Sequence, residues 1–94
     1  MSESKEALAV FSFAVQDYAA WHKVWEEGAP IRARHGNIGA EAFQDPKDPN
    51  KVVVVDRYRD LGSLERFLAD PHLKAAQERA GVTGAPTILI AVAG

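Results

Sequence analysis

The pattern of hydrophobic and polar positions along the chain predicts four strands and two helical segments. Residues 6–15 are rich in Val, Phe and Ala and predict a first strand. Residues 38–44 and 51–59 predict an antiparallel hairpin, because the segment between them, 45–50, is dense in turn formers. The last apolar run, residues 86–93, predicts a closing strand. Between these strands, apolar residues recur at i, i+3 and i+4, which indicates amphipathic helices and gives the order βαββαβ.

Each helical segment should contain one break. Asp17 is a suitable N-cap for the first segment, and Pro30 lacks the N–H that a continuous helix needs, so a kink or restart is predicted there. Asp60 is a suitable N-cap for the second segment. Asp70 and Pro71 then supply a second cap with proline at the first helical position, which predicts another restart.

Three of the predicted strands are apolar on both faces. Val52 and Val54 point to one side of the sheet, and Val53 and Val55 point to the other. Right-handed crossovers place both helices of a βαββαβ sheet on one side, so one apolar face stays uncovered. We therefore expect a homodimer that packs through this sheet face about a two-fold axis, with a different partner protein as the alternative. The pattern does not decide which face meets the helices.

Size and composition bound the class of protein. The 94 residues support a single domain spanning 1–94. A net charge of −2 gives no basic surface for nucleic acid or an anionic membrane. The absence of cysteine excludes disulfides and cysteine-based metal sites. The first fifteen residues lack signal-peptide features, and no apolar run is long enough to span a bilayer, so a soluble, cytoplasmic protein is expected.

Four segments carry a family resemblance. They are DYxxW at 17–21, DPxDPN at 45–50 before the valine strand, LxxFLxxPxLK at 64–74, and AGVxGxP at 80–86. Together they resemble the dimeric α+β barrel superfamily, and in particular small bacterial proteins of the antibiotic-biosynthesis-monooxygenase type. The resemblance implies an α+β, ferredoxin-like fold with a four-stranded antiparallel sheet. It also implies a site in a cleft between sheet and helices.

The superfamily includes cofactor-free oxygenases, haem-degrading enzymes, small isomerases and cyclases, dehalogenases, and proteins without known activity. Its haem-degrading members use an Asn on the first strand, which this sequence lacks. The resemblance therefore implies a cofactor-independent monooxygenase- or cyclase-like enzyme that acts on a small aromatic or enolic substrate. The alternative is a non-catalytic dimer that binds a small apolar ligand or is associated with stress. Fold alone does not choose between these.

The first helix supplies the first candidate site residues. Tyr18, Trp21 and Trp25 fall on one helical face, where they either wall a flat apolar ligand or pack on the sheet. His22 lies at the border of that face. With Tyr18 it is the candidate catalytic group, because a neutral imidazole can remove a proton from a phenol or enol. The alternative for His22 is a solvent-facing boundary position.

The third strand ends in a polar run. Asp56 and Tyr58 share one face, and Arg57 and Arg59 share the other, so one pair could hold an anionic oxygen. Arg57 and Tyr58 are therefore candidate substrate-binding residues. The alternative is a salt bridge across the dimer or to Glu41.

The remaining candidates are weaker. His72 follows Pro71 in a first helical turn, where the helix dipole favours a neutral imidazole that can bind substrate, although such a position is usually exposed. Arg32 is expected on the solvated side of the first helix. The three histidines lie on separate elements without metal-ligand spacing, so no metal is predicted. The family resemblance implies that no cofactor is needed.

Overall fold

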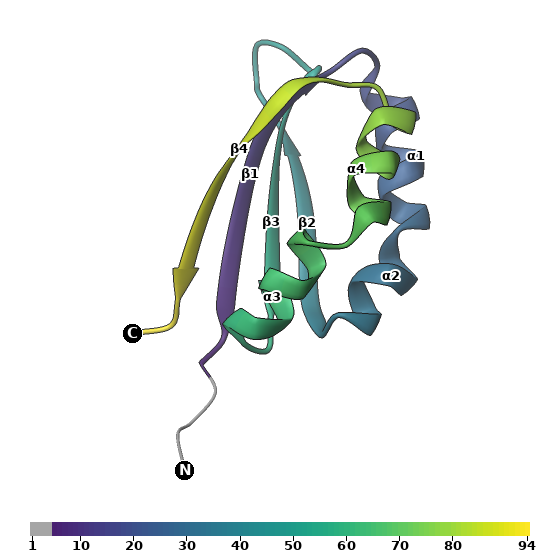
Figure 1. The fold of residues 1–94 in the computed structure, drawn as a ribbon. Coiled ribbons are helices and arrows are strands. Elements are labelled where there is room, and N and C mark those ends of the chain that lie inside the picture. The colour runs from purple at the N-terminus through teal and green to yellow at the C-terminus, as the bar shows by residue number, and fades with distance from the viewer. Residues whose placement is uncertain (1–4) are drawn as a thin grey trace.

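The four strands form one antiparallel sheet, and the helices lie on one of its faces (Figure 1). The computed structural model describes residues 5–94. In chain order the elements are β1 (Ala7–Val15), α1 (Tyr18–Glu27), α2 (Ala29–Arg34), β2 (Asn37–Gln44), β3 (Lys51–Tyr58), α3 (Leu61–Leu68), α4 (Pro71–Arg79) and β4 (Val82–Val92). The order across the sheet is β2-β3-β1-β4. The α+β, ferredoxin-like fold that the sequence predicts is confirmed.

Both predicted helix breaks are present, with the predicted causes. At the start of α1, Asp17 accepts a hydrogen bond of 3.3 Å from the backbone N–H of Ala19. The chain then restarts as α2, with Pro30 in its first turn. At the second break, Asp70 accepts a bond of 2.8 Å from the backbone N–H of His72 at the start of α4. Local cap chemistry therefore fixes where each short helix begins.

One face of the sheet packs against the helices and carries the core. Alternate residues of β1 and β3 point to this face, and they meet Trp21 of α1 and Leu64 and Phe67 of α3. The buried hydrophobic residues are Ala7, Ala9, Phe11, Val15, Trp21, Val52, Val54, Tyr58, Leu64, Phe67 and Ala80. The structure thus settles which of the two apolar faces meets the helices.

The opposite face of the sheet remains apolar and accessible. Val53 and Val55 of β3 are half-buried there, while Phe43 of β2 and Leu89 of β4 are 49% and 67% exposed. The helices leave this face uncovered (Figure 1). The sequence-based expectation of a second apolar face is therefore confirmed.

The last strand begins earlier than the sequence predicts. Strand β4 starts at Val82, which pairs with Val15 of β1, rather than at Pro86. The register of this pairing shifts between Ser12 and Ala14. The shift lies opposite a stretch with Gly84 at a φ of 73°, so turn-forming residues that suggest a loop sit in a bulge within the strand.

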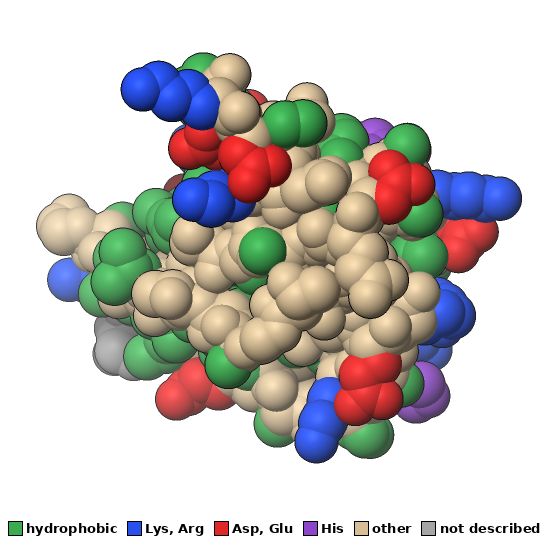
Figure 2. Space-filling model, turned by 90° about the horizontal axis from the view of Figure 1, so that it is seen from above, with side chains coloured by type: hydrophobic (Ala, Val, Ile, Leu, Met, Phe, Trp, Pro, Cys, Tyr) green, Lys and Arg blue, Asp and Glu red, His purple; other side chains and the backbone are tan. Residues whose placement is uncertain are grey.

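The end of the molecule where the β1–α1, β2–β3 and α4–β4 connections meet carries charges of both signs. Figure 2 shows Lys, Arg, Asp and Glu side chains spread around its rim, with backbone and uncharged polar atoms between them. Neither sign of charge gathers on this view, in keeping with the formal net charge of −2. None of the described helices is both long and apolar enough to cross a bilayer.

Candidate functional site

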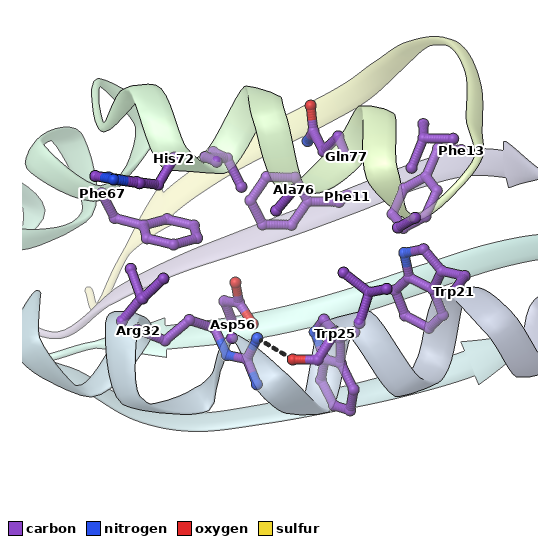
Figure 3. Close-up of a pocket in the computed structure, with 16 residues that line it drawn as sticks. Phe11, Phe13, Trp21, Trp25, Arg32, Asp56, Phe67, His72, Ala76 and Gln77 are labelled. Carbon is purple, nitrogen blue, oxygen red and sulfur yellow. Dashed lines mark hydrogen bonds between the residues drawn. The ribbon is translucent and has the colours of Figure 1, made fainter.

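A cavity of about 100 Å³ lies between the sheet and the helices. Most of its wall is apolar: Phe11 and Phe13 come from β1, Trp21 and Trp25 from α1, and Phe67 from α3 (Figure 3). Helix α4 closes one side, yet none of its nine residues is buried. The cavity lies where the family resemblance places a site.

The two tryptophans of α1 stack against each other in the cavity wall. Their rings are stacked, with centroids 5.6 Å apart and an interplanar angle of 18°. Phe13 lies against Trp21 at 5.4 Å. Because Trp21 and Trp25 are four residues apart, one helical face presents both indoles to the cavity. An aromatic wall of this kind suits a flat apolar ligand.

Asp56 brings a carboxylate into this apolar wall. The residue is only 2% exposed, and its Oδ1 is buried without a hydrogen-bond partner. Burial raises the pKa of Asp56 from 3.8 to about 6, and the nearby charge of Arg32 opposes the rise. The sequence contained a signal for this residue, since Asp56 is in phase with the buried residues Val52 and Val54.

Arg32 is the second charged group in the wall, and the prediction that it lies on the solvated side is wrong. It is 8% exposed, and its guanidinium donates a 2.8 Å hydrogen bond to the backbone oxygen of Trp25. The guanidinium carbon lies 4.7 Å from the Trp25 ring centroid. Arg32 follows Trp25 by seven residues, about two helical turns, and therefore falls on the same helical face; the prediction rests on residue type and does not use this spacing.

Arg32 and Asp56 do not form a direct ion pair. Within the described part of the chain, the ion pairs with a nitrogen–oxygen distance of 4.0 Å or less all involve histidines. The two side chains nevertheless lie near each other in the cavity wall, between Phe67 and Trp21 (Figure 3). A carboxylate and a guanidinium therefore face one apolar space without neutralising each other by contact.

Comparison with known protein families identifies the family of the chain. The family model for antibiotic biosynthesis monooxygenase matches residues 7–79. The chain belongs to this family. No curated protein matches the chain.

Solved structures of the family share the fold. SnoaB, a cofactor-independent oxygenase from Streptomyces nogalater, has a TM-score of 0.80 at 21% identity, over 97% of this chain and 95% of that one. A proposed antibiotic biosynthesis monooxygenase from Caulobacter crescentus has a TM-score of 0.79 at 21% identity, over 97% and 92% of the two chains. One from Bordetella bronchiseptica has a TM-score of 0.79 at 13% identity, over 93% and 95%.

In this member of the family, Tyr18 and His22 lie outside the cavity lining. Their rings are neighbours, with centroids 5.5 Å apart. His22 is half-buried, and its Nδ1 lies 2.9 Å from Glu26 Oε1 on the flank of α1. Because His22 follows Trp21 directly, the helix turns it away from the face that Trp21 presents to the cavity. Of the residues predicted on α1, the structure brings the two tryptophans to the cavity.

Arg57 and Tyr58 are separated by the alternation of β3. Tyr58 is fully buried on the helix side, 5.4 Å from the ring of Phe67, and burial raises the pKa of its phenol. Arg57 is exposed on the opposite face, where Glu41 also points. Glu41 forms no ion pair within 4.0 Å among the described residues. Neither candidate belongs to the cavity lining.

His72 sits at the rim of the cavity. Its side chain is 74% exposed, and its Nδ1 lies 2.9 Å from Asp70 Oδ1. The other oxygen of Asp70 lies 2.8 Å from His35 Nε2. The hydrogen bond with His35, followed by the bonds from His72, holds the pKa of Asp70 well below its usual range. This cluster ties the start of α4 to the end of α2.

Residues 5–94 contain no group of three or more His, Asp or Glu side chains placed to hold a metal ion. The polar groups that line the cavity are Arg32, Asp56, His72 and Gln77. Two of these, Asp56 and Arg32, are buried. The site therefore offers acid–base and electrostatic chemistry within an apolar space.

Proposed function

We propose that this chain is a cofactor-independent oxygenase that acts on a small aromatic or enolic substrate bound in the cavity. The observation that carries the proposal is an aromatic cavity whose buried polar groups are one carboxylate and one guanidinium, Asp56 and Arg32. Membership of the family and the likeness to SnoaB, itself a cofactor-independent oxygenase, support it.

The chemistry needs an acidic substrate. Removal of a proton from a phenol or an enolisable ketone leaves an electron-rich anion that can pass an electron to O₂. The substrate radical and superoxide then combine, and the proton removed at the start returns to give a hydroperoxide on a carbon that still bears hydrogen. Loss of water from this hydroperoxide leaves C=O at that carbon. One oxygen atom of O₂ enters the product and the other leaves as water, so the reaction balances without another reductant. An apolar cavity favours these steps because it excludes water from the anion and from its products.

The cavity volume limits the substrate. A cavity of about 100 Å³ is smaller than the ~150 Å³ that holds benzene in an engineered protein. The site therefore accommodates a small enol or one edge of a ring, and a larger substrate requires α4 to move outward. The lack of buried residues in α4 supports such a movement.

The proposed oxygenase is a homodimer that packs through the open face of the sheet. Phe43 and Leu89 on that face are 49% and 67% exposed, and the half-buried Val53 and Val55 lie between them. A face of this kind is costly to leave in water. A second copy related by a two-fold axis covers this face with its own identical apolar face.

Oxygen uptake tests the proposal. Purified protein is mixed with small phenols and cyclic 1,3-diketones in a chelator, without added cofactor, and O₂ consumption is followed with an electrode. We expect uptake that depends on the protein and yields a product one carbonyl oxygen richer. Trp21→Ala should abolish uptake, while Ala20→Ser on the exposed side of α1 serves as the matched control. Ligand-induced quenching of tryptophan fluorescence without any O₂ uptake would contradict an oxygenase and favour a non-catalytic binding protein.

A further inference from the structure

We infer that Asp56 is the proton acceptor of the cavity and that Arg32 holds the resulting oxyanion, so that the site selects phenols and enols over neutral aromatics of the same shape. This inference rests on the proposed function, because it needs a ligand in the cavity. It assigns the acid–base role to β3 and α2 instead of to Tyr18 and His22.

The first argument is the unpaired state of Asp56. Buried carboxylate oxygens almost always have hydrogen-bond partners, and leaving one without a partner is costly. Asp56 Oδ1 has none within the protein, although the residue is 2% exposed and lines the cavity. The neighbouring guanidinium donates to the backbone oxygen of Trp25 and stays beyond ion-pair distance of Asp56. A ligand O–H is the donor that this carboxylate lacks.

The second argument is proton affinity. Burial raises the pKa of Asp56 to about 6, so near neutral pH the carboxylate is mostly ionised yet binds a proton more strongly than an exposed aspartate does. A carboxylate with this raised pKa is better matched to weakly acidic phenols and enols than an exposed aspartate is. The step is balanced: the ligand O–H bond breaks, its proton forms the carboxylic acid of Asp56, and its electron pair remains on the ligand oxygen.

The third argument concerns the negative charge that proton transfer leaves on the ligand oxygen. After the transfer, Asp56 is neutral and the negative charge lies on the ligand oxygen next to Asp56, where the Arg32 guanidinium is also near (Figure 3). A guanidinium in a water-poor space stabilises such an oxyanion more strongly than water-screened charges do. Of the described carboxylates, Asp56 is the one in the cavity lining, whereas His72 at the rim is exposed and bonded to Asp70.

A pair of probes separates this inference from the proposed function. 4-Nitrophenol and its methyl ether, 4-nitroanisole, have almost the same shape, but only the phenol can give up a proton. Binding of each is measured by quenching of tryptophan fluorescence, and bound phenolate by its visible absorbance, at a pH below the pKa of the free phenol. We expect the phenol to bind about tenfold or more tightly than the ether and to show phenolate absorbance when bound.

Two isosteric or near-isosteric variants complete the test. Asp56→Asn should remove the phenolate absorbance and the preference for the phenol while it still binds the ether. Arg32→Gln should weaken the phenolate signal by about tenfold. The exposed matched controls are Glu65→Gln and Arg34→Gln, and circular dichroism verifies the fold of each variant. If the wild type binds both probes equally, or if Asp56→Asn keeps the phenolate signal, the inference is overturned and the cavity remains a ligand site. If neither probe binds, the inference is overturned, and oxygen uptake with a small cyclic 1,3-diketone decides separately whether the proposed function holds.

Discussion

The guanidinium of Arg32 lies over the indole of Trp25, 4.7 Å from the ring centroid, and donates a 2.8 Å hydrogen bond to the backbone oxygen of the same residue. One side chain of α2 thus satisfies a carbonyl of α1 near the break between the two helices. It also holds the ring that forms a wall of the cavity. The buried charge of Arg32 therefore links the break between α1 and α2 to the aromatic wall of the cavity.

Removal of this contact should destabilise the fold. Arg32→Met keeps an unbranched apolar stem but loses the charged hydrogen bond and the cation–π contact, and should lower the free energy of unfolding by about 2 kcal/mol. Arg34→Met on the exposed side of α2 should change it by less than ~0.5 kcal/mol. Urea unfolding at fixed protein concentration measures both. Equal effects for the two variants would show that the Trp25 contact contributes nothing.

Asp56 should make stability depend on pH. Its pKa is raised from 3.8 to about 6 in the folded state, so folding favours the protonated form. The contribution is fully present below about pH 4 and is lost as pH rises through about pH 6. The loss amounts to about 3 kcal/mol. Asp56→Asn has no such proton to lose, so its stability relative to the wild type should grow across this window. A difference that stays constant with pH would contradict the raised pKa.

His22 should be dispensable for turnover. It lies outside the cavity lining and pairs with Glu26 on the flank of α1. His22→Ala should therefore change the rate of oxygen uptake by less than about twofold, with a change in unfolding free energy within ~0.5 kcal/mol. Trp21→Ala removes a buried indole and should cost about 3 kcal/mol or more. A large loss of turnover in folded His22→Ala would restore His22 as the base that the sequence suggested.

The proposed dimer should depend on the open face of the sheet. Leu89 is 67% exposed in the single chain, so Leu89→Asp places a charge where the partner would pack. Native mass spectrometry should show the wild type at twice the chain mass and the variant shifted to monomer. Lys74→Asp, on the exposed side of α4, should remain dimeric. A wild-type monomer would contradict the assembly itself.

Much of the fold could be predicted because its signals are local. Asp17, Pro30 and Asp70 mark helix starts and breaks through cap chemistry that depends on neighbouring residues alone. The four strands follow from apolar runs rich in Val, Ile and Phe that are separated by turn formers and helical patterns. The start of β4 could not be predicted, because Gly84 and Pro86 are turn formers by themselves and form a bulge only when β1 lies beside them.

The site could be predicted only in part. Trp21 and Trp25 follow from helical spacing, and both line the cavity. The burial of Asp56 depends on which apolar face meets the helices, a tertiary property that a periodic pattern does not contain. Arg32 lies seven residues after Trp25, on the same helical face, so its position follows from the spacing; the prediction for it is wrong because it rests on the usual exposure of arginine. His22 and Arg57 seemed suitable by residue type, but the periodicity of their own elements turns them away from the cavity.

Helix α4 covers the cavity, yet none of its residues is buried. Its attachment relies on the half-buried Leu73, which packs against the core, and on its two ends, where Asp70 contacts His35 and Ala80 enters the core. Segments with so little buried surface detach at a free energy well below that of global unfolding. The amides of α4 should accordingly exchange with solvent deuterium much faster than those of β1 or β3, and a ligand in the cavity should slow them. Under the proposed function, outward movement of α4 would open the cavity to a substrate.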